Sequence, residues 1–62
     1  MEKPIVKLIG QDGNVFNLAG IVSSALKKAG LKDQAKEFQT RLFNCRSYGE
    51  ALQLMTEYVE VK

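Results

Sequence analysis

The chain has 62 residues, a net charge of +2 and a hydrophobic content of 45%, which suits one small globular domain and no more. Such a chain buries only about 60% of its unfolded surface, so its core is small and self-association would cover more apolar surface. No segment approaches the roughly 20 apolar residues of a membrane helix, and the start lacks the pattern of a signal peptide. A single cysteine fits a reducing compartment. We therefore expect one cytoplasmic domain over residues 1–62.

The first expected elements are a strand and a hairpin turn. Residues 5–9 are rich in β-branched side chains and lie between Pro4 and Gly10, which is typical of a strand. Asp12-Gly13 is a common two-residue hairpin turn. It predicts a short return strand through Val15 and Phe16, antiparallel to the first.

A helix is predicted over residues 18–29. Asn17 suits its N-cap, and Gly30 suits a left-handed C-cap. With these ends, Phe16 and Ile21 occupy the two positions of a hydrophobic staple. An apolar stripe with helical period supports the assignment; it comprises Leu18, Ala19, Val22, Ala25, Leu26 and Ala29.

Two further helices are predicted. The second begins with Asp33 as N-cap, and its buried seam repeats at helical spacing through Leu31, Ala35, Phe38, Leu42 and Cys45. Ser47 and Glu50 form an S-x-x-E capping box, so a third helix starts near Tyr48. Its apolar stripe is Tyr48, Ala51, Leu52, Met55, Tyr58 and Val59.

The end of the chain has two interpretations. Residues 58–61 alternate like a strand that would pair with the first strand, or they continue the third helix; we prefer the strand. The expected class is α+β, with a small antiparallel sheet packed on a helical hairpin and a third helix.

The residue inventory argues against an enzyme and against a cofactor. The chain has no histidine, which is the usual general base near neutral pH. With no histidine and one cysteine, it also lacks the ligands that a transition-metal site usually needs. Cys45 completes the seam of the second helix, where a thiol acts as a small hydrophobic group. Dinucleotide and P-loop fingerprints are lacking. We expect no catalytic residues, no metal and no cofactor.

Two nucleic-acid motifs are weak matches. Residues 10–13 read G-x-x-G, as in KH domains, but they follow a strand and Asp12 would repel phosphate. The pair of helices around Gly30 suggests a helix-turn-helix, yet Lys36 and Gln39 stand where that motif needs apolar side chains. A turn and an ordinary helical hairpin are the better interpretations.

Phe43 does not fit the seam of the second helix. It lies about 140° around the helix from Phe38, on a polar face with basic neighbours, as a binding anchor would. The alternative is that the helix frays at Leu42 and Phe43 folds back into the core, which the following Asn-Cys-Arg-Ser favours.

Two functional hypotheses follow. The first is a non-enzymatic module that binds an unidentified protein or a second copy of itself, as a possible homodimer. Its candidate face is Lys32, Lys36, Gln39, Thr40 and Phe43. The second is a weak nucleic-acid binder, because residues 23–46 carry six basic against two acidic residues, a net charge of +4. Its basic face would be Lys27, Lys28, Lys32, Lys36, Arg41 and Arg46; a solvated face without a ligand is the simpler interpretation.

Three segments also carry a resemblance. They are the opening Lys7-Leu8-Ile9-Gly10-x-Asp12-Gly13-Asn14-x-Phe16, the Ala-Leu-Lys-Lys-Ala-Gly helix end, and Met-x-x-Tyr-Val-Glu-Val at 55–61. Together they resemble a group of short bacterial and phage-associated proteins. The connection at 43–48 departs from the Gly-Asp-Tyr turn of that group. The resemblance implies a prophage or mobile-element setting, and it implies no activity and no site residues.

Overall fold

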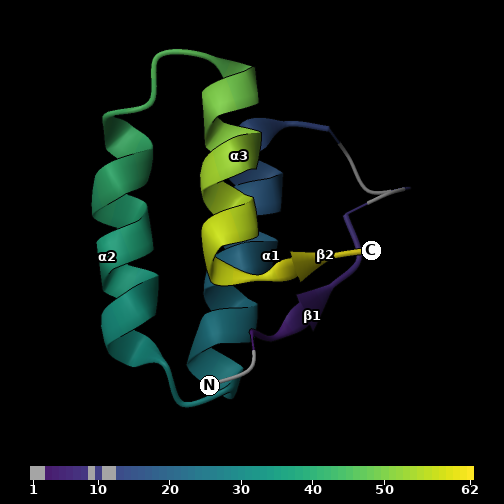
Figure 1. The fold of residues 1–62 in the computed structure, drawn as a ribbon, viewed down its shortest axis with the longest axis vertical. Helices are drawn as coiled ribbons and strands as arrows, with labels where there is room; N and C mark the ends of the chain where they lie inside the picture. The colour runs from purple at the N-terminus through teal and green to yellow at the C-terminus, as the bar shows by residue number, and fades with distance from the viewer. Residues whose placement is uncertain (1–2, 9, 11–12) are drawn as a thin grey trace.

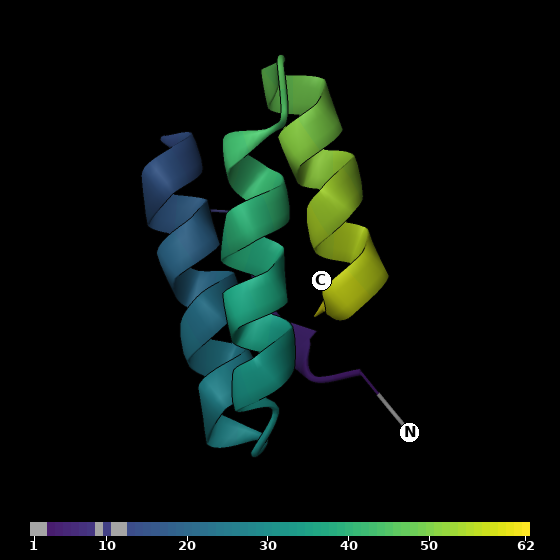
Figure 2. The same ribbon diagram turned by 90° about the vertical axis from the view of Figure 1, so that its left-hand side faces the viewer.

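The computed structural model describes residues 3–8, 10 and 13–62. Three helices make up most of this part of the chain: α1 (Val15–Lys28), α2 (Lys32–Phe43) and α3 (Tyr48–Tyr58). They pack side by side as a bundle, and two short strands, β1 (Ile5–Val6) and β2 (Glu60–Val61), lie on the side away from α2 (Figures 1 and 2). The α+β class is confirmed.

The small sheet is parallel, and the predicted antiparallel sheet is wrong. Ile5 lies opposite Glu60, and Val6 lies opposite Val61. The predicted return strand is absent because Val15 and Phe16 belong to α1, so β1 pairs with the other end of the chain. The three helices supply the long crossover that a parallel pair requires. Within the predicted hairpin turn, Asp12 lies outside the described residues.

Helix α1 starts earlier than predicted because Asn14, and not Asn17, is its N-cap. The Asn14 side chain accepts a hydrogen bond from the Phe16 amide at 2.8 Å. This start adds Val15 to the apolar stripe, where it packs against the core, and leaves Phe16 75% exposed in the first turn. The predicted staple between Phe16 and Ile21 is therefore wrong.

The junction between α1 and α2 is a Schellman turn, as the predicted Gly30 C-cap requires. Gly30 has φ = 78°, its amide donates to the Lys27 carbonyl at 3.0 Å, and the Leu31 amide donates to the Leu26 carbonyl at 2.8 Å. The next helix begins at Lys32, with Asp33 in its first turn rather than at its N-cap. An acidic side chain is favourable there because it faces the positive end of the helix dipole.

The start of α3 confirms the predicted cap, and the strand preferred for residues 58–61 is confirmed at residues 60–61 only. Ser47 accepts a hydrogen bond from the Glu50 amide at 3.1 Å, while the Glu50 carboxylate accepts from the Arg46 amide at 3.2 Å. The helix ends at Tyr58, after which residues 60–61 form β2.

The core lies where the three helices meet. Its largest fully buried side chains are Val22, Leu26, Phe38, Met55 and Val59. The predicted seam of α2 is confirmed, with Ala35 and Phe38 buried and the other three members packed at the margin. Leu54, which the predicted stripe of α3 omitted, is buried, and Tyr48, which it included, is exposed. Among the described helices, none has the length and apolar character needed to cross a membrane.

Candidate binding groove

The exposed aromatic side chains converge on one place. The chain has five aromatic residues. Phe38 and Tyr58 pack edge to face in the core, with ring centroids 5.5 Å apart. The other three, Phe16, Phe43 and Tyr48, are 75%, 86% and 47% exposed, and all three line the same groove.

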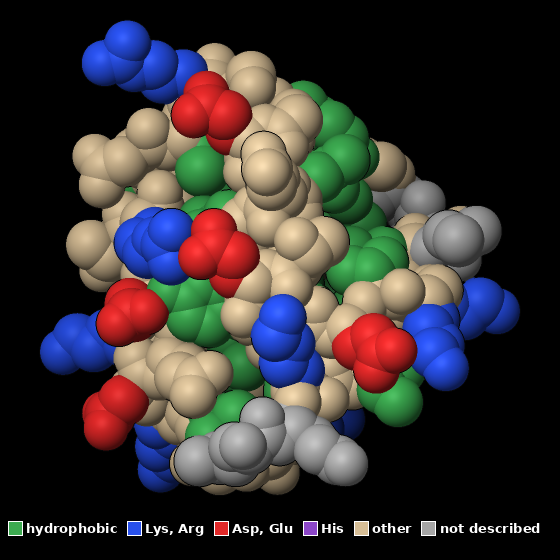
Figure 3. Space-filling view, in the orientation of Figure 1, with side chains coloured by type: hydrophobic (Ala, Val, Ile, Leu, Met, Phe, Trp, Pro, Cys, Tyr) green, Lys and Arg blue, Asp and Glu red, His purple; other side chains and the backbone are tan. Residues whose placement is uncertain are grey.

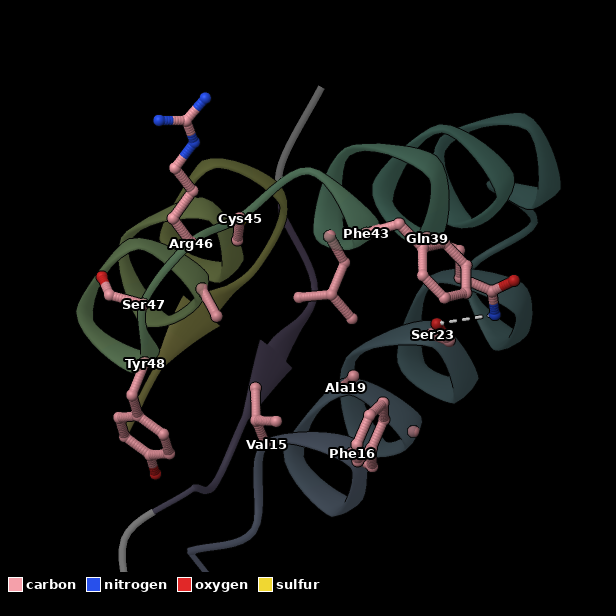
Figure 4. Close-up of a pocket in the computed structure, with 13 residues that line it drawn as sticks. Val15, Phe16, Ala19, Ser23, Gln39, Phe43, Cys45, Arg46, Ser47 and Tyr48 are labelled. Carbon is pink, nitrogen blue, oxygen red and sulfur yellow. Dashed lines mark hydrogen bonds between the residues drawn. The ribbon is translucent and has the colours of Figure 1, made fainter.

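The groove is bounded by the first turns of α1, the last turns of α2 and the start of α3, and its volume is about 610 Å³. Helix α1 contributes small residues to its wall, Ala19, Gly20 and Ser23, which leave the space open. In Figure 4, Phe16 and Phe43 lie on one side and Tyr48 stands on the other. Three separate elements therefore hold the three rings around a shared hollow.

The groove offers few polar groups. The Gln39 side-chain amide donates to the Ser23 hydroxyl at 3.2 Å, which joins α2 to α1 along one wall. Ser47 is engaged as the cap of α3. Arg46 is the one charged side chain that lines the groove among the described residues, and its guanidinium points away from the hollow (Figure 4). The surface suits an apolar occupant.

Cys45 lines the same groove. It is the chain's one cysteine, it is a half-buried free thiol, and its Sγ lies 3.6 Å from the Arg41 carbonyl oxygen. It also packs at the margin of the core, in agreement with its predicted place at the end of the α2 seam.

The structure divides the predicted interaction face. All five of its residues are exposed on α2, but only Gln39 and Phe43 line the groove. Lys32 and Lys36 lie toward the other end of the helix, and Thr40 donates to its own helix at the Lys36 carbonyl. The favoured interpretation that Phe43 folds back into the core is wrong, because α2 continues to Phe43 and leaves its ring in solvent.

The sequence predicts other roles for two of the three rings of the groove. It pairs Phe16 with Ile21 in a staple and places Tyr48 in the apolar stripe of α3. The sequence contains a signal that Phe16 is exposed, because Phe16 lies off the apolar stripe of α1. It contains no such signal for Tyr48, because the exposure of Tyr48 depends on how the connection at residues 44–47 orients the start of α3.

The six predicted basic residues do not form one face. Lys27 and Lys28 lie in the last turn of α1. Arg41 lies about 180° around α2 from Lys32 and forms an ion pair with Glu57 at 3.2 Å, while Arg46 lies beside the groove. On the face drawn in Figure 3, acidic side chains are interspersed among the basic ones.

A polar cluster around Tyr58 ties α2 to α3 on the side of Arg41. The Tyr58 hydroxyl donates to the Glu37 carboxylate and accepts from Arg41 at 3.2 Å. Burial and the hydrogen bond to Glu37 raise the pKa of Tyr58 above 10.0. The hydrogen bonds to Tyr58 and Glu57 raise the pKa of Arg41, so the guanidinium stays charged. Every partner here is another residue of the cluster, which is the arrangement of a structural link.

Among the described residues, no three His, Cys, Asp or Glu side chains are grouped so that they could hold a metal ion. No protein-family model matches the chain, and no curated protein or solved structure shows significant similarity to it. The resemblance to short bacterial and phage-associated proteins stays a prediction.

Proposed function

We propose that this protein is a non-enzymatic interaction module that binds a polypeptide in the groove between α1, α2 and α3. The observation that carries the proposal is the convergence of three exposed rings, Phe16, Phe43 and Tyr48, on one apolar hollow. Aromatic side chains around a desolvated pocket are the groups that dominate binding energy in protein interfaces.

The exposure of these rings has an energetic cost that a partner would remove. Burial of apolar surface is worth roughly 25 cal/mol per Å², so a phenylalanine left in solvent forgoes about 1.5–3 kcal/mol. Phe38, in the same helix, is fully buried, whereas Phe43 is 86% exposed. Two such rings beside one hollow form the kind of apolar patch that marks an interaction site.

The lack of a histidine and the engagement of Ser23 and Ser47 in structural hydrogen bonds support a binding role over a catalytic one. The nucleic-acid alternative loses support from the placement of its residues, because a backbone-binding surface needs its positive charges gathered along one face. Here Arg41 is paired with Glu57, and the six residues are spread over α1, both sides of α2 and the α2–α3 connection.

Site-specific photo-crosslinking tests the proposal. A benzophenone side chain placed at Phe43 keeps an aromatic group at the groove. The matched control is the same side chain at Lys36, which is exposed on the same helix about two turns away and does not line the groove. Irradiation of cells that make the protein should give one discrete crosslinked product from position 43 and none from position 36.

The crosslinked product identifies the bound polypeptide by mass spectrometry, whether it is another protein or a second copy of this chain. No product from position 43, or the same smear of products from both positions, would contradict a binding role for the groove.

A further inference from the structure

Resting on the proposed function of the groove, we propose that its occupant is a second copy of the same chain, held in a two-fold symmetric dimer. Phe43 and Phe16 of each copy enter the groove of the other. Three properties of the surface carry this inference: its shape, its charge and its area.

The shape places a projecting ring beside a hollow. In a two-fold interface the same patch occurs on both sides, so a projecting group must lie next to the hollow that receives its counterpart. Phe43 projects from the end of α2 with 86% of its surface exposed, at the edge of a hollow of about 610 Å³. The small side chains of Ala19, Gly20 and Ser23 leave that hollow unfilled.

The charge permits self-association. A patch that carries several charges of one sign repels its own copy, because like charges face each other across the two-fold axis. This groove is lined by one charged side chain among the described residues, Arg46, and its guanidinium points outward (Figure 4).

The area is of the right order for a dimer. The exposed parts of the three rings amount to roughly 400 Å² per copy, taking about 150–250 Å² for a whole aromatic side chain. A standard interface buries about 800 Å² per partner, of which the rings alone would provide about half. A chain of 62 residues has a small core, and oligomerisation is a common way to stabilise such a domain.

Dilution of the purified protein tests the inference. Molar mass by light scattering, followed from about 1 mM to about 1 μM protein, should fall from that of two chains to that of one. Cys45 gives a second readout, because it lies in the groove and is the chain's one thiol. Its alkylation rate should increase about tenfold over the same dilution.

Three variants connect the readouts to the groove. In Phe43→Ala, each dimer loses two rings, so the dissociation constant should rise roughly 30-fold to 1,000-fold. In Gly20→Lys, a charge enters the groove at a helical position where an added Cβ meets nothing within 4 Å, so dimerisation should be lost in a folded protein. Lys36→Ala is the control and should leave the dissociation constant within about twofold.

A molar mass of one chain at every concentration, with a constant Cys45 alkylation rate, would overturn the dimer. A dimer that survives both Phe43→Ala and Gly20→Lys would place the interface elsewhere and overturn it equally. A discrete crosslink from position 43 to a different protein, together with a monomer in solution, would reject the second copy and leave the proposed function in place.

Discussion

Two phenylalanines of one helix provide the sharpest test of the structure. Phe38 and Phe43 both belong to α2, but Phe38 is 0% exposed and Phe43 is 86% exposed. Replacement of each by alanine removes the same atoms from the two environments. The difference in the free energy of unfolding between the two variants therefore measures burial directly.

The expected magnitudes differ widely. Phe38→Ala leaves a cavity in the centre of the core and removes the ring contact with Tyr58, which should cost about 3–5 kcal/mol. A domain of this size has a total stability of roughly 3–9 kcal/mol, at about 0.05–0.15 kcal/mol per residue, so this variant should lose a large part of its stability. Phe43→Ala removes a solvated ring from a helix, and the monomer's stability should change by no more than about 0.5 kcal/mol.

Urea denaturation followed by far-ultraviolet circular dichroism is the appropriate assay, because the chain has no tryptophan. Dilute protein reports the monomer. At high concentration, wild-type unfolding should shift to higher urea, because the dimer stabilises the folded chain by mass action, and this shift should vanish in Phe43→Ala. A loss of about 3 kcal/mol in dilute Phe43→Ala would make Phe43 a core residue and contradict its exposure in the structure.

Tyr58 and two glycines provide further tests of the structure. Tyr58 in a Tyr48→Phe variant should titrate with a midpoint above pH 10, because burial and the hydrogen bond to Glu37 raise its pKa. The protonated phenol therefore stabilises the folded state fully at pH values below the unfolded pKa of about 10. This stabilisation is lost as the pH rises through the pKa of Tyr58 in the folded protein. A midpoint at or below pH 10 in the absorbance titration would contradict the structure. Gly30→Ala should destabilise the protein by about 1–2 kcal/mol because φ is 78° at that position. Gly20→Ala should stabilise the protein by about 0.5–1 kcal/mol because Gly20 is inside a helix with open space around it. Thermal melting measures both substitutions. Equal effects of the two would contradict the positive φ of Gly30 and the helical position of Gly20.

Signals that are local in sequence predicted the helices well. The cap at Ser47 and the left-handed Gly30 were confirmed because each depends on backbone groups within a few residues. The α2 seam was confirmed because helical spacing alone sets which side chains share a face. The start of α1 was misplaced because Asn14 and Asn17 are equally good caps by composition, and packing of Val15 against the core decides between them.

Features that depend on distant residues were predicted less well. The Asp12-Gly13 signal indicated a hairpin, but β1 pairs with β2 at the far end of the chain, and sequence alone does not reveal which strands will be neighbours. The groove shows the same limit. Phe43 could be identified from its own helix, whereas its association with Phe16 and Tyr48 requires three elements to be packed together.

We expect the groove to be covered in the cell, and the alkylation rate of Cys45, which lines the groove, tests this. Its alkylation rate should be measured with a membrane-permeable reagent in cells that make the protein, and in purified, dilute protein, with the urea-unfolded chain as the upper limit. We predict a rate at least about tenfold lower in cells than in dilute solution, and Gly20→Lys should restore the higher rate. Equal rates in cells and in dilute solution would show an open groove and contradict the proposed dimer.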